Sequence, residues 1–539
     1  MKRSLFIFLF FCSFFPGYSL DGFMYRLILK DKGNPPFSTE QPELFLSGKS
    51  IQRRLKQNLA VDSADLPIDG SYLEAIANTG ADIRAYSKWA KTVTVRFSDL
   101  SLVPQLKNLP FVDTLYCVWK GSFPQQLMFR EDKYVLQNDT AENNLNGYDA
   151  GFAQIALNNG HLLHAAGFRG EGMTIAVIDG GFIHADVINY FDFQRIKGVK
   201  SFSHELSDPL QEGADHGTKA LSCMLPDRPG ELIGTAPEAD YYLLRTEVDG
   251  EEYPVEEDYW VAALEYADSI GADIVTSSLG YSEFDDSLMN HAHSQLDGKS
   301  VPISIAAGLA ASRGMLLFNA AGNEGNKPWG KIMFPCDALN MLAIGAITGD
   351  SARSNFSSVG HTADGRIKPD LMAMGAGVTV VSGSGQINSG SGTSFATPIL
   401  AGLSACLWQA LPELTGFEII ELLRETANAF SHPDSLTGFG IADVYKAYTR
   451  NRTGLKPAGT EDAVYFCINA RENRLYLNFN RLKNNSQFVL DIYSGVGIRL
   501  LSVPNVSSPV DISSLPEGIY IARLQTGGRP VFVRKFIKM

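Results

Sequence analysis

The chain has 539 residues, 45% of them hydrophobic, and a formal net charge of −13 at pH 7. This length and apolar content allow several globular domains, each with a core of its own. The charge disfavours nucleic acid as a partner, because phosphate binding depends on a compact stripe of Lys and Arg and the sequence has none.

The first twenty residues have the pattern of a secretory signal peptide. Basic residues at the start precede a largely apolar run, Leu5 to Phe15, and the small residues Gly17 and Ser19 follow it. A run of about a dozen residues at about 1.5 Å per residue is too short to span a bilayer of about 30 Å. We therefore expect residues 1–20 to be a signal peptide, no transmembrane segment, and a mature chain that is secreted or held at the cell surface.

The cysteines are widely scattered and form no C-x-x-C pair. This spacing argues against a zinc site and against a dense disulfide framework, although one disulfide stays open. Cys12 lies in the predicted signal peptide, and the other cysteines are Cys117, Cys223, Cys336, Cys406 and Cys467.

Residues 21–120 have the pattern of a small α+β domain. We expect strands at Phe23–Leu29, Val93–Phe97 and Val112–Trp119, and a basic helix at Ser50–Leu59. The next segment, residues 121–150, is polar and poor in large aliphatic side chains, which is typical of an exposed linker.

Residues 151–452 alternate apolar runs with helical segments, which is the signature of a parallel sheet covered by helices on both faces. The runs are residues 174–179, 240–246, 273–280, 314–323 and 341–347. In such α/β sheets, reacting groups gather outside the carboxyl ends of the strands. The polar residues that close these runs are therefore the candidates for a functional site.

The last segment, residues 453–539, alternates apolar and polar residues in short runs separated by turn signals. This pattern predicts a small antiparallel β-sandwich.

Ser394 lies directly before an apolar segment, Phe395 to Ala410, that we expect to form a buried helix. The N-terminus of a helix presents unpaired N–H groups and a positive dipole, which favour negative charge on a bound carbonyl oxygen. Gly390 and Gly392 would let a substrate backbone pass close by. A serine nucleophile needs a base within hydrogen-bond reach.

His216 can supply that base, since it opens another helical run. Asp179 ends the apolar run 174–179, where a half-buried carboxylate would hold the imidazole in one tautomer. Asn323 follows the run that begins at residue 314, and its amide could donate to an oxyanion alongside the backbone N–H of Ser394.

Four motifs in this order, "AVIDGGF", "DHGT", "AAGN" and "SGTSFATPILAG", identify the segment as similar to the subtilisin-like serine proteases (subtilases, peptidase family S8). The resemblance implies a secreted serine endopeptidase with the triad Asp179, His216 and Ser394, in the chain order of subtilisin. It also implies Asn323 as the oxyanion donor and an acyl-enzyme intermediate.

The resemblance extends to the binding of protein or peptide substrates. One wall of the S1 pocket, shared with S4, would come from "SSLG", the opposite wall from "AAG", and the pocket floor from Met333, which would favour small or medium apolar P1 residues. The residues implied are Ser278, Leu279, Gly280, Ala320, Ala321, Gly322 and Met333. In one departure, Met374 stands where the family usually has a proline, and we expect it in a loop.

The flanking segments resemble parts of secreted proteases. Residues 21–120 resemble in arrangement the propeptides that help subtilases to fold and then block the cleft, which implies a zymogen cut between Lys120 and about Gly151. Residues 453–539 resemble the C-terminal sorting domain that Bacteroidetes proteins carry for type IX secretion, which implies that secretion machinery as a partner. A structural or carbohydrate-binding β-sandwich stays open for this segment.

Other functions and sites also stay open. The chain could be a catalytically silent, surface-displayed binding protein with the subtilase fold, or a hydrolase of esters. A phosphate loop at Ser389–Ser394 is disfavoured because the motif's lysine is missing. His184 as the base, and His291 with His293 as metal ligands, are weaker alternatives outside the matching motifs. No cofactor is required, and the family resemblance allows a structural calcium ion that no local run of ligands locates.

Overall fold

A computed structural model describes residues 21–122, 150–203, 208–452, 465–469, 474–478, 488–494, 498–506, 510–516, 518–526 and 529–538. The predicted signal peptide and nearly all of the predicted linker lie outside the described residues. The chain divides into two compact units, one up to Tyr448 and one from Thr449 onward. No helix of the described segments is long and apolar enough to cross a membrane.

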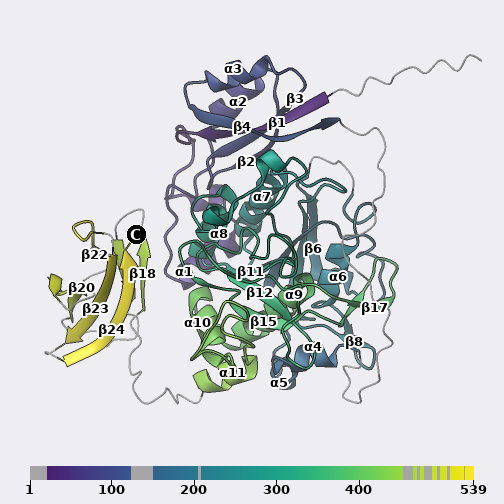
Figure 1. Cartoon of the computed structure of the whole chain (residues 1–539), viewed down its shortest axis with the longest axis vertical. Coiled ribbons are helices and arrows are strands. Elements are labelled where there is room, and N and C mark those ends of the chain that lie inside the picture. Colours follow the sequence, from purple (N-terminus) through teal and green to yellow (C-terminus); the bar gives the residue numbers. More distant parts are fainter. Residues whose placement is uncertain are drawn as a thin grey trace, which may run out of the picture. The chain divides into compact units, whose positions relative to one another are not determined.

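A seven-stranded sheet forms the centre of the first unit. Its strands are β5 (Thr174–Asp179), β6 (Ile196–Ser201), β9 (Asp240–Arg245), β10 (Ile274–Ser277), β11 (Leu316–Ala320), β12 (Leu342–Ile347) and β15 (Leu371–Met374). They lie in the order β15-β12-β11-β10-β5-β9-β6, and every neighbouring pair is parallel (Figure 1). The five predicted runs are confirmed as β5, β9, β10, β11 and β12.

Helices cover both faces of this sheet. They are α4 (Phe152–Ala156), α5 (Gly160–Ala165), α6 (His216–Ser222), α7 (Val255–Ile270), α8 (Pro302–Ser312), α9 (Thr393–Ala410), α10 (Gly416–Thr426) and α11 (Val444–Arg452). Successive residues of a strand point to opposite faces. Ile175 and Val177 accordingly pack with Ile399 of α9 in one core, and Ala176 packs with Leu264 of α7 in another. The expected α/β fold is confirmed.

Shorter elements complete this part of the chain. Two-stranded pairs are β7 (Asp227–Arg228) with β8 (Leu232–Ile233), β13 (Gly360–His361) with β14 (Ile367–Lys368), and β16 (Val378–Val381) with β17 (Ile387–Gly390). Short 3₁₀ helices are η2 (Phe193–Arg195), η3 (Ser287–Met289) and η4 (His293–Gln295). The expectation for Met374 is wrong: it ends strand β15 and is buried, so it does not lie in a loop.

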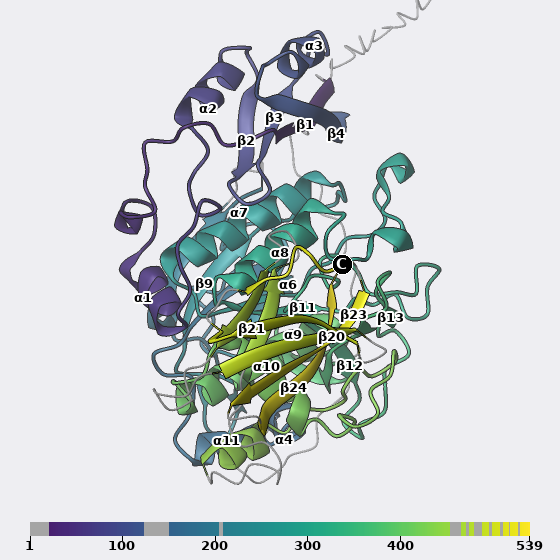
Figure 2. The same cartoon turned by 90° about the vertical axis from the view of Figure 1, so that its left-hand side faces the viewer.

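The N-terminal domain is an antiparallel sheet with helices. Its elements are β1 (Asp21–Leu29), η1 (Pro42–Leu44), α1 (Gly48–Lys56), α2 (Gly70–Ala77), β2 (Asp82–Ser87), β3 (Thr92–Phe97), α3 (Leu102–Lys107) and β4 (Val112–Ser122). The strand order is β2-β3-β1-β4. Helices α2 and α3 lie on one face of the sheet and α7 lies beyond the other, as Figures 1 and 2 show. The predicted strands and the basic helix are confirmed as β1, β3, β4 and α1.

The second unit contains two antiparallel sheets. One is β18 (Tyr465–Asn469), β19 (Arg474–Asn478) and β22 (Val510–Asp511), and the other is β20 (Phe488–Ser494), β21 (Arg499–Pro504), β23 (Gly518–Thr526) and β24 (Arg529–Lys538). Leu475 of the first sheet and Leu490, Ile492 and Leu524 of the second share one buried core. The β-rich C-terminal segment therefore agrees with the prediction.

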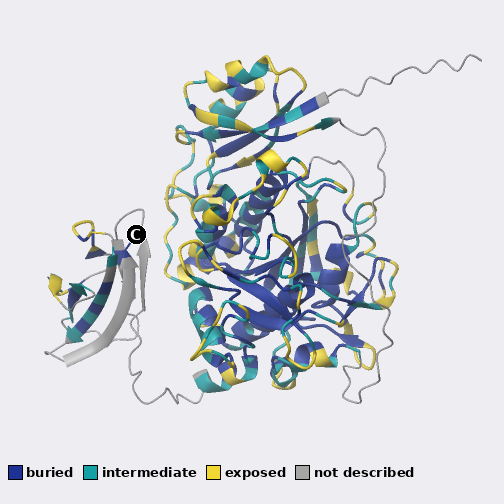
Figure 3. Cartoon of the chain, viewed as in Figure 1, coloured by how far each residue is buried: buried dark blue, intermediate teal, exposed yellow. Residues whose placement is uncertain are grey.

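Burial is concentrated in the strands of the seven-stranded sheet, and exposed residues lie around it (Figure 3). All six residues of β5 are buried, including the charged Asp179 at its carboxyl end. A buried carboxylate is costly unless it has hydrogen-bond partners.

Candidate active site

Asp179 and His216 lie together at the carboxyl edge of the sheet. Asp179 is the last residue of β5 and is fully buried, and His216 is the first residue of α6 and is 4% exposed. His216 Nδ1 lies 2.6 Å from Asp179 Oδ1, which also accepts from the backbone N–H of Gly180 at 2.8 Å. Because a carboxylate only accepts hydrogen bonds, Nδ1 carries the proton, and Nε2 on the other side of the ring is the basic nitrogen.

Ser394 is the second residue of the long helix α9 and is 2% exposed. Its hydroxyl lies 3.3 Å from the carbonyl oxygen of Ser278, whose own hydroxyl donates to the Ser394 carbonyl at 2.8 Å. The ring of the next residue, Phe395, has its centroid 6.0 Å from that of His216. The starts of α6 and α9 therefore lie next to each other.

Asn323 is held by Thr393, the residue before Ser394. The side-chain oxygen of Asn323 accepts from the backbone N–H of Thr393 at 2.9 Å and from its hydroxyl at 3.0 Å. These two donors fix which end of the amide faces away from Thr393. A Cβ atom placed on Gly392 would lie 3.5 Å from Asn323 Nδ2 and 3.7 Å from the backbone N of Ser394. The two predicted oxyanion donors thus flank a single point.

The segments predicted to bind substrate lie side by side. Strands β10 and β11 pair in parallel with Ser277 opposite Asn319, so "SSLG" and "AAGN" leave the sheet together. The segment that contains Met333 joins both of them: Met333 N–H donates to the Ala321 carbonyl at 3.1 Å, and Tyr281 and Phe334 exchange two backbone hydrogen bonds of 3.0 Å.

Met333 fills the space between these two segments. A Cβ atom on Gly280 would lie 2.9 Å from Met333 Cβ, and one on Gly322 would lie 2.8 Å from both Cγ and Sδ of Met333. Gly322 also has φ of +107°, a conformation that favours glycine. The half-buried Met333 side chain therefore lies against both predicted walls.

The other histidines named from the sequence bind elsewhere. His184 Nδ1 lies 2.8 Å from the carbonyl of Gly383. His291 Nε2 lies 2.6 Å from Glu257, and His293 Nε2 lies 3.0 Å from a backbone carbonyl. Each ring thus has a partner of its own outside the Asp179–His216 pair.

The described cysteines are free and mostly buried: Cys117, Cys223, Cys336 and Cys406. Cys336 lies behind one predicted S1 wall, and its thiol donates to the Ala320 carbonyl at 3.0 Å. Burial raises the pKa of the Cys336 thiol to about 12, so it stays protonated and does not compete as a nucleophile. The side chain of Cys467 lies outside the described residues.

One group of carboxylates in the described part of the chain has metal-ligand spacing. Oxygens of Glu247, Glu252 and Glu256 lie within 4.8 Å of one another. Calcium takes six to eight oxygen ligands. One oxygen of Glu256 accepts a hydrogen bond from Val248 N–H and the other accepts one from Tyr253 N–H. Burial and the two neighbouring carboxylates raise the pKa of Glu256 well above the usual range. These three carboxylates alone do not identify a calcium site.

Thr393 contacts the predicted site residues but is not predicted from the sequence. It lies inside the motif "SGTS", in which only Ser394 and the glycines were assigned a role from the sequence. A hydroxyl residue directly before a nucleophile, with an amide elsewhere to orient, is the signal that could have found it.

Known proteins share these sequence patterns. Residues 170–440 match the Subtilase family (Peptidase S8), and residues 24–131 match the Peptidase S8 propeptide domain of Bacteroidota. The chain is 27% identical to Subtilisin NAT of Bacillus subtilis subsp. natto over 302 residues, 54% of this chain and 70% of that protein.

One further relative and one solved structure are also similar to parts of the chain. Subtilisin of Bacillus pumilus is 27% identical over 273 residues, 49% of this chain and 87% of that protein. The crystal structure of MycP1 from Mycobacterium smegmatis aligns with a TM-score of 0.45 and 20% identity, covering 59% of this chain and 89% of that one. Because the family match covers half of the sequence, this chain belongs to the subtilases and is a serine endopeptidase with a propeptide domain.

Proposed function

We propose that Asp179, His216 and Ser394 form the catalytic triad that hydrolyses peptide bonds in protein or peptide substrates. His216 Nε2 takes the hydroxyl proton of Ser394 as its oxygen attacks the substrate carbonyl, and the same proton then passes to the leaving amine. The resulting acyl-enzyme is hydrolysed by water, with His216 again acting as base. The observation that carries this proposal is the 2.6 Å contact between His216 Nδ1 and Asp179.

Negative charge develops on the carbonyl oxygen during the attack. Asn323 Nδ2 and the backbone N–H of Ser394 are the proposed donors, and the positive end of the α9 dipole adds to them. The two contacts from Thr393 to Asn323 support this role, since an oxyanion donor is effective only if its direction is fixed before the reaction.

The test compares casein with short acyl esters as substrates for the wild type and for Ser394→Ala, His216→Ala and Asn323→Ala. Loss of either triad residue should reduce kcat by about 10⁴-fold or more, and loss of one oxyanion donor by about 10²- to 10³-fold. Wild-type turnover of esters without casein would favour the esterase reading. Activity of Ser394→Ala equal to wild type would show that the nucleophile is another residue.

Met333 is proposed to set the P1 preference. Its side chain lies against Gly280 and Gly322 and leaves less room between the predicted walls than a glycine at position 333 would leave. We therefore infer a preference for small or medium apolar P1 residues, such as Ala or Val, over Phe or Arg.

Export and maturation complete the proposal. Residues 1–20 would direct the chain across the inner membrane, and residues 453–539 would act as a type IX sorting domain that brings it to the cell surface or the medium. Residues 21–120 would block the active site until the linker, residues 121–150, is cut. Cell fractionation of the full chain and of a variant lacking residues 453–539 tests the sorting role: retention of the truncated variant in the periplasm supports it, and unchanged export contradicts it.

A further inference from the structure

The sheet of the propeptide domain contacts the catalytic body, residues 150–448, through α7 and the segment before it. Arg26 of β1 forms ion pairs of 2.5 Å with Asp258 and 3.3 Å with Glu257. Trp119 of β4 donates from its ring nitrogen to Glu251 at 2.5 Å. These contacts bring the basic and polar side of the sheet onto an acidic helix.

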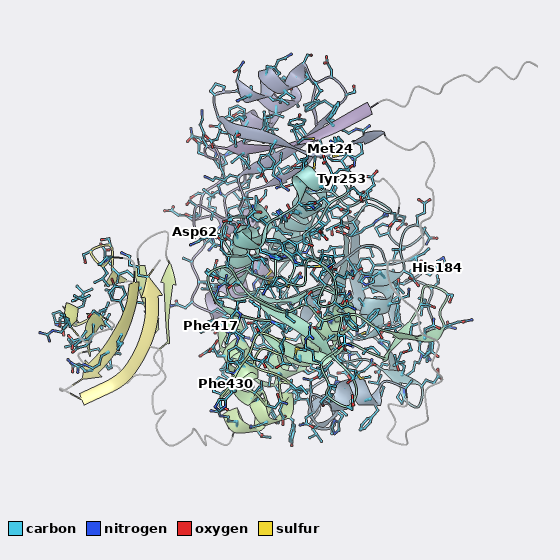
Figure 4. The ribbon with its side chains drawn as sticks, viewed as in Figure 1. Met24, Asp62, His184, Tyr253, Phe417 and Phe430 are labelled. Carbon is cyan, nitrogen blue, oxygen red and sulfur yellow. The ribbon has the colours of Figure 1, made fainter. Side chains whose placement is uncertain are left out.

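A second segment of the propeptide domain, which we call the clasp (residues 47–65), reaches a different part of the body. Its helix α1 lies well away from strands β1 to β4 in both views of the chain (Figures 1 and 2). Figure 4 labels Met24 of β1 and Tyr253 of the body, which lie close together where the sheet meets the body. Asp62 of the clasp lies apart from this pair, in the direction of Phe417. Gln57 bridges two elements of the body, since its side chain donates to the Gly314 carbonyl at 2.7 Å and accepts from Gly416 N–H at 3.0 Å.

Arg53 of the clasp enters a site made by the carboxyl ends of α7 and α8. Its guanidinium donates to the Ala272 carbonyl at 2.5 Å, to the Arg313 carbonyl at 3.3 Å and to the Asp268 carboxylate at 2.5 Å. Arg53 is 5% exposed and Asp268 is fully buried. Carbonyl groups at a helix C-terminus lack intrahelical donors and carry partial negative charge. A planar guanidinium with five N–H groups matches three acceptors held in fixed directions.

Arg54 pairs with the same aspartate from the next position of the helix. It donates to the other Asp268 oxygen at 2.9 Å and to Asp65 within the clasp at 3.0 Å, and it is 1% exposed. The catalytic body also supplies a cation to the clasp, because Arg313 donates to Asp65 at 3.0 Å and to Asp62 at 2.7 Å. The clasp thus supplies cations to Asp268 of the body, and the body supplies a cation to Asp62 and Asp65 of the clasp. Separation of the two would leave Asp268 and Arg313 without these partners.

This site lies at the edge of the sheet opposite the triad. The side chain of Lys49, in the clasp, hydrogen-bonds Thr174, the first residue of β5, whereas Asp179 is the last residue of that strand. The five steps from Thr174 to Asp179, at about 3.3 Å each, separate the two edges by roughly 16 Å. The clasp therefore holds the domain without touching the reacting atoms.

We propose that the carboxyl ends of α7 and α8, with Asp268, form a guanidinium-binding exosite on the catalytic body, and that Arg53 and Arg54 of the propeptide domain are its ligands. Through this exosite the domain stays bound after the linker has been cut. This inference rests on the proposed maturation of the chain, but docking of the propeptide domain does not depend on which protease cuts the linker.

The test uses full-length Ser394→Ala protein with a thrombin recognition sequence inserted within residues 123–149. After the thrombin cut, size-exclusion chromatography over a dilution series measures how tightly the propeptide domain is held. Arg53→Ala with Arg54→Ala should weaken binding by about 100-fold or more, because a buried charge loses its partner. Lys56→Ala is the matched control, since it removes an exposed cation from the same helix and should change binding by less than about threefold.

Two further variants separate recognition from folding. Asp268→Asn changes only the body and should also weaken binding, because the carboxylate that accepts from both arginines is lost. Arg53→Lys with Arg54→Lys keeps the charges but not the planar forks, and should fall between wild type and the alanine pair. Binding by Asp268→Asn as tight as that of Lys56→Ala would overturn the exosite, and wild-type binding by the lysine pair would overturn its preference for guanidinium. Because thrombin makes the cut, neither result depends on the activity of Ser394.

Discussion

Thr393 donates both its backbone N–H and its hydroxyl to the side-chain oxygen of Asn323, at 2.9 and 3.0 Å. The residue before the proposed nucleophile thereby directs the proposed oxyanion donor. The Thr393 hydroxyl also accepts from Gly322 N–H at 3.2 Å, so one side chain links the start of α9 to the predicted S1 wall.

Replacing this hydroxyl should affect the transition state more than substrate binding. We expect Thr393→Val to lower kcat by roughly 10-fold with little change in KM, less than the 10²- to 10³-fold loss from removing an oxyanion donor outright. Thr393→Ser keeps the hydroxyl and should stay close to wild type in steady-state kinetics with a peptide substrate. Equal kcat for the Val and Ser variants would contradict the positioning role.

Removing the bulk of Met333 should open the S1 site to large side chains. For Met333→Gly we expect the ratio of kcat/KM for a Phe P1 substrate to that for an Ala P1 substrate to rise by about 10-fold or more, since steric terms in a pocket are worth about 1–3 kcal/mol. Met333→Leu keeps most of the volume and is the control. A wild-type enzyme that already prefers Phe or Arg would contradict the proposal for this residue.

Two helical glycines should respond to alanine in opposite directions. A Cβ atom on Gly402 of α9 would lie 2.0 Å from Thr235 Oγ1, whereas one on Gly308 of α8 would meet nothing closer than 3.9 Å. Gly402→Ala should therefore lose about 1–3 kcal/mol of unfolding free energy through overpacking. Gly308→Ala should gain up to about 1 kcal/mol through helix propensity. Urea unfolding in the Ser394→Ala background, where we expect no self-cleavage, measures both.

His164 should make the fold less stable in acid. It is 7% exposed, its Nε2 lies 3.0 Å from the Thr235 carbonyl, and burial lowers its pKa to about 4. Between pH 6.5 and 4 the unfolded chain binds a proton that the folded chain does not, so stability falls as the pH falls through this window, by up to about 3 kcal/mol.

The pH dependence of unfolding in urea checks this expectation. His164→Gln removes the titrating group and should flatten the slope of stability between pH 6.5 and 4. His432→Gln, at an exposed position, should leave the slope as in the wild type. The same slope in all three proteins would assign the acid sensitivity to other groups.

The parts of the fold that could be predicted are those whose sequence carries a local signal. Strands β5 and β12 are buried on both faces, which produces continuous apolar runs. Strand β6 lies at the sheet edge and mixes buried with exposed residues, so it does not produce such a run.

The candidate site divides in the same way. Asp179 and His216 could be brought together from the sequence because each lies at the end of an element that reaches the same edge of the sheet. The clasp could not be predicted: Arg53 and Arg54 belong to a basic helix of the kind that is usually solvated, and their shared partner Asp268 lies more than 200 positions further along the chain. Nothing local distinguishes a buried arginine pair from an exposed one.

Intact-mass spectrometry of the wild type beside Ser394→Ala, before and after a fluorophosphonate probe, tests directly whether Ser394 is the nucleophile. We expect the wild type to lose its N-terminal domain and gain one probe adduct, and Ser394→Ala to do neither. A folded wild type that stays full length and unlabelled, or a Ser394→Ala variant that still takes up the probe, would contradict Ser394 as the nucleophile.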